Sequence, residues 1–69
     1  MRQAIHTEFI RLDTLMKLCA MTPTGGQAKE KIQTGQVQVN GSVCTQRGKK
    51  LRVGDCVTVD GTTVEIVGE

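Results

Sequence analysis

The sequence predicts a small α+β domain, with two short packed helices followed by a small, mainly antiparallel β-sheet built from hairpins. A chain of 69 residues has room for one domain. Its apolar residues follow a helical spacing early in the chain and alternate further on. The dipeptides Asn40-Gly41 and Asp60-Gly61, both typical of hairpin turns, interrupt the alternating part. We therefore expect residues 1–69 to form a single domain.

The first helix is expected over residues 11–20, where apolar residues recur at intervals of three and four. Its apolar stripe consists of Leu12, Leu15, Met16 and Cys19. Residues 22–26, Thr-Pro-Thr-Gly-Gly, are expected to end this helix. Residues 5–10 are compatible with a short strand before it.

A second helix is expected over residues 25–33. Thr24 is suited to the N-cap position, and Gln27, three residues later, completes a capping-box pattern. Ala28 and Ile32 form a short apolar stripe. We therefore expect two short helices side by side, joined by a tight turn.

The rest of the chain predicts strands. Apolar and polar residues alternate over 37–39, and the Asn-Gly turn leads into a return strand over 43–45. A second hairpin is expected from the strand at 57–59 to the strand at 63–67.

The net charge of +2 conceals a strong asymmetry. Residues 1–52 hold all nine basic residues and three acidic ones, a net charge of +6. Residues 53–69 hold four acidic residues and no Lys or Arg, a net charge of −4. This polarity indicates one face directed at a polyanion and another turned away from it.

Composition argues against several classes of function. Phe9 is the single aromatic residue and is expected in the core, so stacking on nucleobases is not expected as the main binding mode. The single histidine, His6, has no obvious catalytic partner, so we expect no enzyme. Three widely spaced cysteines predict reduced thiols, two of them in the core, and no metal site or cofactor. No apolar run is long enough for a membrane span or signal peptide, and we expect a cytoplasmic monomer.

The most informative segment is 46–52, Gln-Arg-Gly-Lys-Lys-Leu-Arg, which places four basic residues within six positions. A solvated loop that only keeps the protein soluble is the alternative interpretation. Further basic residues avoid the two apolar stripes: Arg11, Lys17, Lys29 and Lys31. Gly25 and Gly26, at the start of the second helix, would offer free backbone N–H groups to an anion, although they are equally compatible with a plain tight turn.

The chain resembles the RNA-binding domain of bacterial ribosomal small-subunit protein four, the alpha-L motif. The resemblance covers residues 9–60. It rests on Arg-Leu-Asp at 11–13, Gly-Gly-Gln-Ala-Lys at 25–29, Gly-Gln-Val-Gln-Val-Asn-Gly at 35–41 and Leu-Arg-Val-Gly-Asp at 51–55. The short length is closest to small stand-alone bacterial members of the family.

The resemblance implies that phosphates are bound by the exposed face of the two helices and by the adjoining loop. Carried over to this chain, the resemblance implies RNA binding by Arg11, Lys17, Gln27, Lys29, Arg47, Lys49 and Lys50. Gly25 and Gly26 join the expected RNA-binding residues through their backbone N–H groups. The implied partner is a structured RNA, ribosomal or tRNA-like, with the ribosome itself as a candidate. A protein–protein adaptor that uses the acidic C-terminal sheet is the alternative.

The chain departs from the family pattern at three places. Gly25-Gly26 stands where many members have Ser-Arg, and Lys31 where an apolar residue is usual. Lys31 therefore either lays its stem along the edge of the core or belongs to a more loosely packed helix. Arg47-Gly48 replaces the frequent Pro-Ser. We interpret these differences as a shift of phosphate binding from the second helix to the loop.

Overall fold

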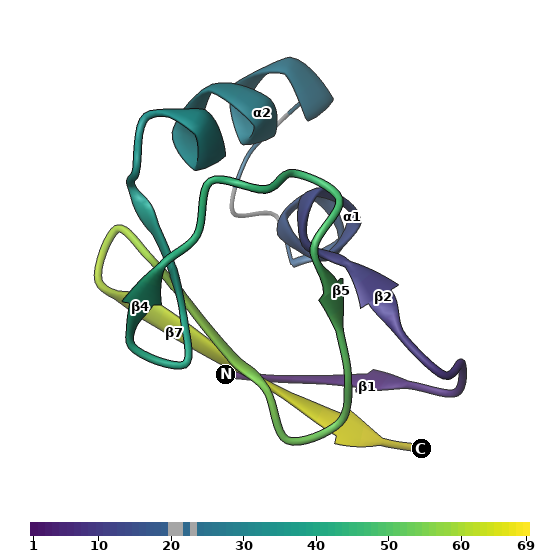
Figure 1. Ribbon diagram of the computed structural model, residues 1–69. Helices are drawn as coiled ribbons and strands as arrows, with labels where there is room; N and C mark the ends of the chain where they lie inside the picture. The colour runs from purple at the N-terminus through teal and green to yellow at the C-terminus, as the bar shows by residue number, and fades with distance from the viewer. Residues whose placement is uncertain (20–21, 23) are drawn as a thin grey trace.

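The computed structural model describes residues 1–19, 22 and 24–69. The helices are α1 (Leu12–Leu18) and α2 (Gly25–Gln33). The strands are β1 (Arg2–Ile5), β2 (Ile10–Arg11), β3 (Val37–Val39), β4 (Ser42–Val43), β5 (Lys50–Leu51), β6 (Cys56–Val59) and β7 (Thr62–Gly68). Both helices lie on the same side of the main sheet (Figure 1). The predicted small α+β fold is therefore present.

The main sheet has the strand order β1-β7-β6-β3-β4. β1 pairs with β7 in parallel, and the other neighbours are antiparallel. β2 and β5 form a separate antiparallel pair. The predicted order, with the helices before the sheet, is wrong, because β1 and β2 precede α1. β1 buries only its last residue, Ile5, so its sequence carries little pattern, and its position depends on pairing with the far end of the chain.

The two predicted hairpin turns are present. Asn40 and Gly41 have φ angles of 53° and 84°, and Asp60 and Gly61 have 51° and 79°. Positive φ at both central residues is the geometry of a tight two-residue hairpin, which Asn-Gly and Asp-Gly adopt readily. The strand expected over 43–45 is shorter and lies at Ser42–Val43.

The helix predictions are correct with adjusted limits. α1 begins at Leu12, and Arg11 is both its N-cap residue and the end of β2. The predicted end at Ala20 lies outside the described residues. α2 has its predicted bounds, and the Oγ1 of Thr24 accepts a hydrogen bond of 3.2 Å from the backbone N–H of Gln27.

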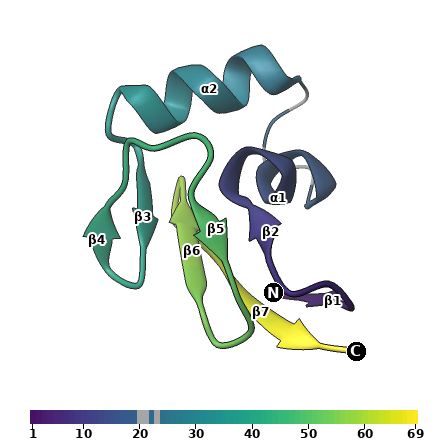
Figure 2. The same cartoon turned by 45° about the vertical axis from the view of Figure 1, so that its right-hand side comes forward.

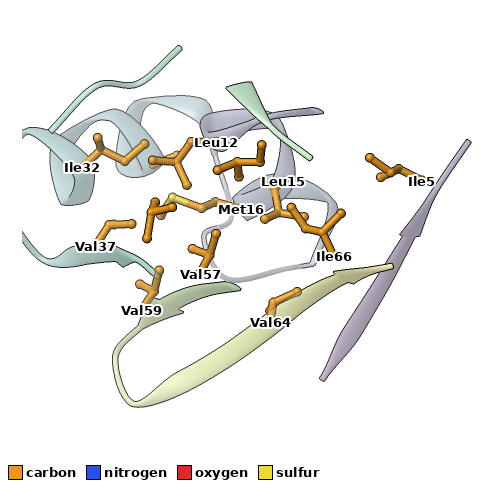
Figure 3. Packing of buried hydrophobic residues seen from close by; sticks show 13 residues of the cluster. Ile5, Leu12, Leu15, Met16, Ile32, Val37, Val57, Val59, Val64 and Ile66 are labelled. Carbon is orange, nitrogen blue, oxygen red and sulfur yellow. The ribbon is translucent and has the colours of Figure 1, made fainter. Parts of the chain in front are cut away.

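An aliphatic core lies between the helices and the sheet (Figure 3). Its fully buried large side chains are Leu12, Leu15, Met16, Ile32, Val37, Leu51, Val57, Val64 and Ile66. Phe9, predicted to be in the core, is only partly buried. Cys19 and Cys44 pack against the core and are likewise partly buried.

The side chain of Asn40 joins the first hairpin turn to the turn before β6. Its Nδ2 donates to the carboxylate of Asp55 over 3.0 Å, and its Oδ1 accepts from the N–H of Cys56 over 2.9 Å. The other carboxylate oxygen of Asp55 accepts from the N–H of Arg52 over 2.8 Å. The hydrogen bond from Arg52, followed by that from Asn40, lowers the pKa of Asp55.

Leu15→Ala is expected to lower the free energy of unfolding by about 2–5 kcal/mol, because it leaves a cavity in a small core. Urea denaturation followed by circular dichroism measures this loss. The matched control is Leu18→Ala on the same helix, where the residue is 57% exposed and the expected change is within about 0.5 kcal/mol. Equal losses at both positions would contradict the packing described here.

Asp55→Asn is expected to flatten the decline of stability in acid. Because the folded pKa of Asp55 lies below its unfolded value, the charged carboxylate stabilises the fold at pH values above about 4. That stabilisation is lost as the pH falls through the folded pKa. Urea midpoints measured from neutral pH into acid should fall less steeply in the variant. Parallel curves for variant and wild type would rule out this role of Asp55.

Candidate nucleic-acid interface

Residues 46–50, which we call the basic loop, lie against the first turn of α1. The N–H of Leu12 donates to the carbonyl of Lys49 over 2.9 Å, and the N–H of Asp13 donates to the carbonyl of Arg47 over 3.2 Å. The first N–H groups of a helix have no partner within the helix, so here the loop satisfies two of them. In Figure 2 the chain runs from β4 past α2 and into β5 beside α1. The loop is therefore held to the helix by backbone hydrogen bonds.

The carboxylate of Asp13 gathers two arginines at this junction. Its Oδ2 lies 3.3 Å from the Nη2 of Arg11 and 3.8 Å from the Nε of Arg47. The carboxylate is 18% exposed, whereas the two arginine side chains are 51% and 48% exposed. Asp13 thus holds two guanidinium groups together while roughly half of each faces solvent.

Three lysines extend this cluster. Lys50 is opposite Arg11 in the β2–β5 pair, and its Nζ lies 4.9 Å from the centre of the Phe9 ring. This geometry is a cation–π contact, and the Phe9 ring that makes it is partly buried. Lys17 follows Asp13 by four residues on α1, so the two share one face of the helix. Lys17, Lys49 and Lys50 are all exposed.

The two flanks of α2 carry different residues. Ala28 and Ile32 are buried, and helical spacing places Lys29 on one side of that stripe and Lys31 on the other. Lys31 forms an ion pair with Asp60 in the β6–β7 turn. In Figure 1 this turn and the 44–49 segment lie on different sides below α2. Lys29 therefore lies on the flank of α2 that faces away from the Lys31–Asp60 pair.

Of the two arrangements expected for Lys31, the structure shows the one with its stem along the edge of the core. Its side chain is 27% exposed, and its ammonium group binds Asp60. The stem thus lies along the edge of the core while the charged end reaches the neighbouring hairpin, so Lys31 packs the helix onto the sheet.

Gly25, Gly26 and Gln27 form the first turn of α2. The N–H of Gln27 is already engaged by Thr24, and the N–H of Ala28 by the carbonyl of Thr24. The Gln27 side chain follows the Lys31 flank, because the two residues are four positions apart. The structure thus brings Arg11, Lys17, Arg47, Lys49 and Lys50 together around the junction of the basic loop and α1. The other four predicted residues belong to α2, where Gly25 and Gly26 lie in the first turn and Gln27 and Lys29 lie on opposite flanks.

The acidic residues of the C-terminal half have partners of their own. Asp60 pairs with Lys31, Glu65 with Arg2 over 3.5 Å, and Glu69 contacts the Nδ1 of His6 over 3.0 Å. Within the described ranges, five basic residues have no carboxylate within 4.0 Å: Lys17, Lys29, Lys49, Lys50 and Arg52. The positive charge is therefore available to a ligand, while much of the negative charge is compensated internally.

Sequence reasoning missed Asp13, Phe9 and β5 as parts of this surface. Asp13 and Phe9 look unremarkable in the sequence, and β5 is only two residues long.

The three side-chain thiols are free, and burial raises the pKa of Cys19. Over residues 1–19, 22 and 24–69, no set of three or more His, Cys, Asp or Glu side chains is grouped to hold a metal ion. None of the helices described is long and apolar enough to cross a membrane.

Comparison with known proteins places the chain among small bacterial proteins. The "Probable ribosome maturation protein RlbA" of Bacillus subtilis (strain 168) is 40% identical over 58 residues, which cover 84% of this chain and 82% of the relative. YbcJ of Escherichia coli (strain K12) is 38% identical over 58 residues, which cover 84% of this chain and 83% of the relative.

A solved structure and a family model agree with these relatives. The solution structure of YbcJ from Escherichia coli, described as an alpha-L motif involved in RNA binding, superposes with a TM-score of 0.67 at 34% identity. The match covers 97% of this chain and 84% of YbcJ. The model of the S4 domain matches residues 3–67, which extends the resemblance noted over residues 9–60 to nearly the whole chain. The chain belongs to the S4 domain family, and its fold is the alpha-L motif.

Proposed function

We propose that this chain binds structured RNA, without catalysing a reaction, through a basic surface that grips phosphates. The basic surface consists of Arg11, Lys17, Lys29, Arg47, Lys49 and Lys50. The observation that carries the proposal is the attachment of the basic loop to α1, which sets Arg11 and Arg47 on one carboxylate. Membership of the S4 family and the RNA-binding description of YbcJ support it.

The chemistry of the basic surface favours phosphates over base edges. Each guanidinium group is a planar fork that matches two phosphate oxygens, and each lysine is a mobile point charge. Asp13 accepts a hydrogen bond from Arg11 and forms a longer ion pair with Arg47, which restricts both side chains, so fewer rotamers are lost when a phosphate binds. Selectivity then follows the shape of a folded RNA.

The start of α2 is a secondary phosphate contact in this proposal. Gly25 and Gly26 allow a close approach to the backbone, but Thr24 already occupies the N–H of Gln27. A phosphate that used the N–H of Gln27 would compete with the helix cap. This supports a shift of phosphate binding from α2 to the basic loop.

The proposed partner is ribosomal RNA, or another folded RNA, in the cytoplasm, with the chain acting as a monomer. The naming of RlbA as a ribosome maturation protein supports the ribosome. The adaptor alternative would need a free acidic sheet, and the pairing of Asp60, Glu65 and Glu69 weighs against it.

Lys49→Glu combined with Lys50→Glu is expected to abolish binding to folded ribosomal RNA fragments without unfolding the domain. Both side chains are exposed, and the reversal places negative charge where phosphates would bind. Gel-shift titrations at two salt concentrations measure the affinity and the number of phosphates. For about 4–6 phosphates, log K for the wild type should fall with log salt at about 0.7–0.9 per phosphate.

A charge-matched pair of variants controls for net charge. Lys49→Gln with Lys50→Gln and Arg2→Gln with Lys31→Gln each remove two positive charges. The first should weaken binding and lower the salt slope by up to about 2, because each lysine accounts for at most one phosphate. The second should leave the salt slope unchanged. Equal effects of the two pairs would mean that binding follows net charge and that the basic surface has no special role.

A further inference from the structure

A cleft borders the basic surface on its β-hairpin side. It lies between the β3–β4 hairpin, the 44–49 segment and the turn before β6, and has a volume of about 380 Å³. Small-molecule sites commonly range from about 300 to 1,000 Å³, so the cleft has room for one nucleotide and none for a duplex. Neither the charge pattern nor the family motif pointed to it.

The cleft has a structural side and a side free to bind. The side-chain amide of Asn40 is already hydrogen-bonded to Asp55 and to the backbone of Cys56. Asn40 therefore forms part of the wall of the cleft. Ser42, Thr45 and Gln46 also line the cleft, and no side-chain hydrogen bond of theirs is formed within the described residues. They offer two hydroxyl groups and one amide to a ligand.

Charge and apolar surface complete the lining. Lys49 stands at the edge shared with the basic surface, and its positive charge contributes to the low pKa of Asp55 inside the cleft. Val43, 60% exposed, adds an apolar side chain. A nucleotide presents the complementary groups: an anionic phosphate, an apolar base face, and base-edge donors and acceptors.

We propose that this cleft receives one unpaired nucleotide of the bound RNA, with its base beside Val43 and Ser42 and its phosphate at Lys49. The inference rests on the proposed function. Proteins that distinguish RNA bases do so mainly at unstacked positions in bulges and loops, and a base that is already unpaired costs least to extrude. The basic surface then holds the flanking stem, and the cleft selects stems with an unpaired position.

Five RNA hairpins with one common stem test this inference. One is fully paired, and each of the others carries a single bulged A, C, G or U. At least one bulged hairpin is expected to bind the wild type about fivefold tighter or better than the paired one, which is the gain expected from roughly one net hydrogen bond to the base. Fluorescence anisotropy at fixed salt measures the affinities.

Two equivalent hairpin positions supply the matched variants. Ser42 follows the Asn40-Gly41 turn and lines the cleft, while Thr62 follows the Asp60-Gly61 turn in β7. Ser42→Tyr should fill the cleft and remove the preference for the bulge while affinity for the paired hairpin persists. Thr62→Tyr should retain the preference. Thr45→Tyr, in a segment outside the strands, repeats the test if Ser42→Tyr lowers the thermal stability.

The outcomes separate the two proposals. Wild-type protein that binds all five hairpins equally would overturn the cleft as a nucleotide site and leave the proposed function standing. A preference that survives the filled cleft, or a filled cleft that weakens the paired hairpin as much as the bulged one, would also overturn it. No binding to any hairpin would contradict both proposals.

Discussion

Two backbone hydrogen bonds, from the first turn of α1 to the carbonyls of Arg47 and Lys49, determine where the basic loop lies. A helix begins with N–H groups that need partners, and in most helices a side chain or water supplies them. Here the segment that follows the β3–β4 hairpin supplies them, through the carbonyls of Arg47 and Lys49. The short β2–β5 pair adds a second attachment next to it. A loop rich in positive charge, which would otherwise repel itself and spread, is thereby fixed to a helix that also carries positive charge.

The electrostatics of the molecule follow from this attachment. Asp13 lies where the helix and loop meet and partly offsets the repulsion between Arg11 and Arg47. Elsewhere, carboxylates of the C-terminal half bind basic residues of other elements, such as Arg2 of β1 and Lys31 of α2. Residues 1–52 carry a net charge of +6 and residues 53–69 a net charge of −4. In the fold, carboxylates of the second segment pair with some of the basic residues of the first, and an excess of positive charge stays around the basic loop. A protein with this distribution attracts polyanions with one surface while its net charge stays at +2.

Local patterns predicted the elements that depend on local physics. The buried stripes of α1 and α2, the Thr24 cap and the two left-handed hairpin turns were all predicted from neighbouring residues. The parallel β1–β7 pair was not, because it joins residues more than 60 positions apart and buries little of β1. The position of Phe9 was not predicted either, because Phe9 contacts Lys50 of the short β2–β5 strand pair, for which the sequence gives no signal.

The same distinction applies to the candidate site. The spacing of the basic residues predicted a loop and two helices as carriers of charge, and the structure brings five of the nine predicted residues together. Helical spacing alone puts Gln27 on the Lys31 flank of α2, but only the structure shows that this flank faces Asp60 in the β6–β7 turn. The role of Asp13 also required the structure, since a single acidic residue next to Arg11 reads equally well as an ordinary helix-start residue.

The central claim is that RNA meets this chain on the basic surface. Chemical-shift mapping tests it most directly, by titrating ¹⁵N-labelled protein with a folded ribosomal RNA fragment that it binds. The largest amide shifts are expected in residues 11–17 and 46–50, with smaller ones at Lys29. Largest shifts in β1 and β7, on the far edge of the sheet, would contradict it.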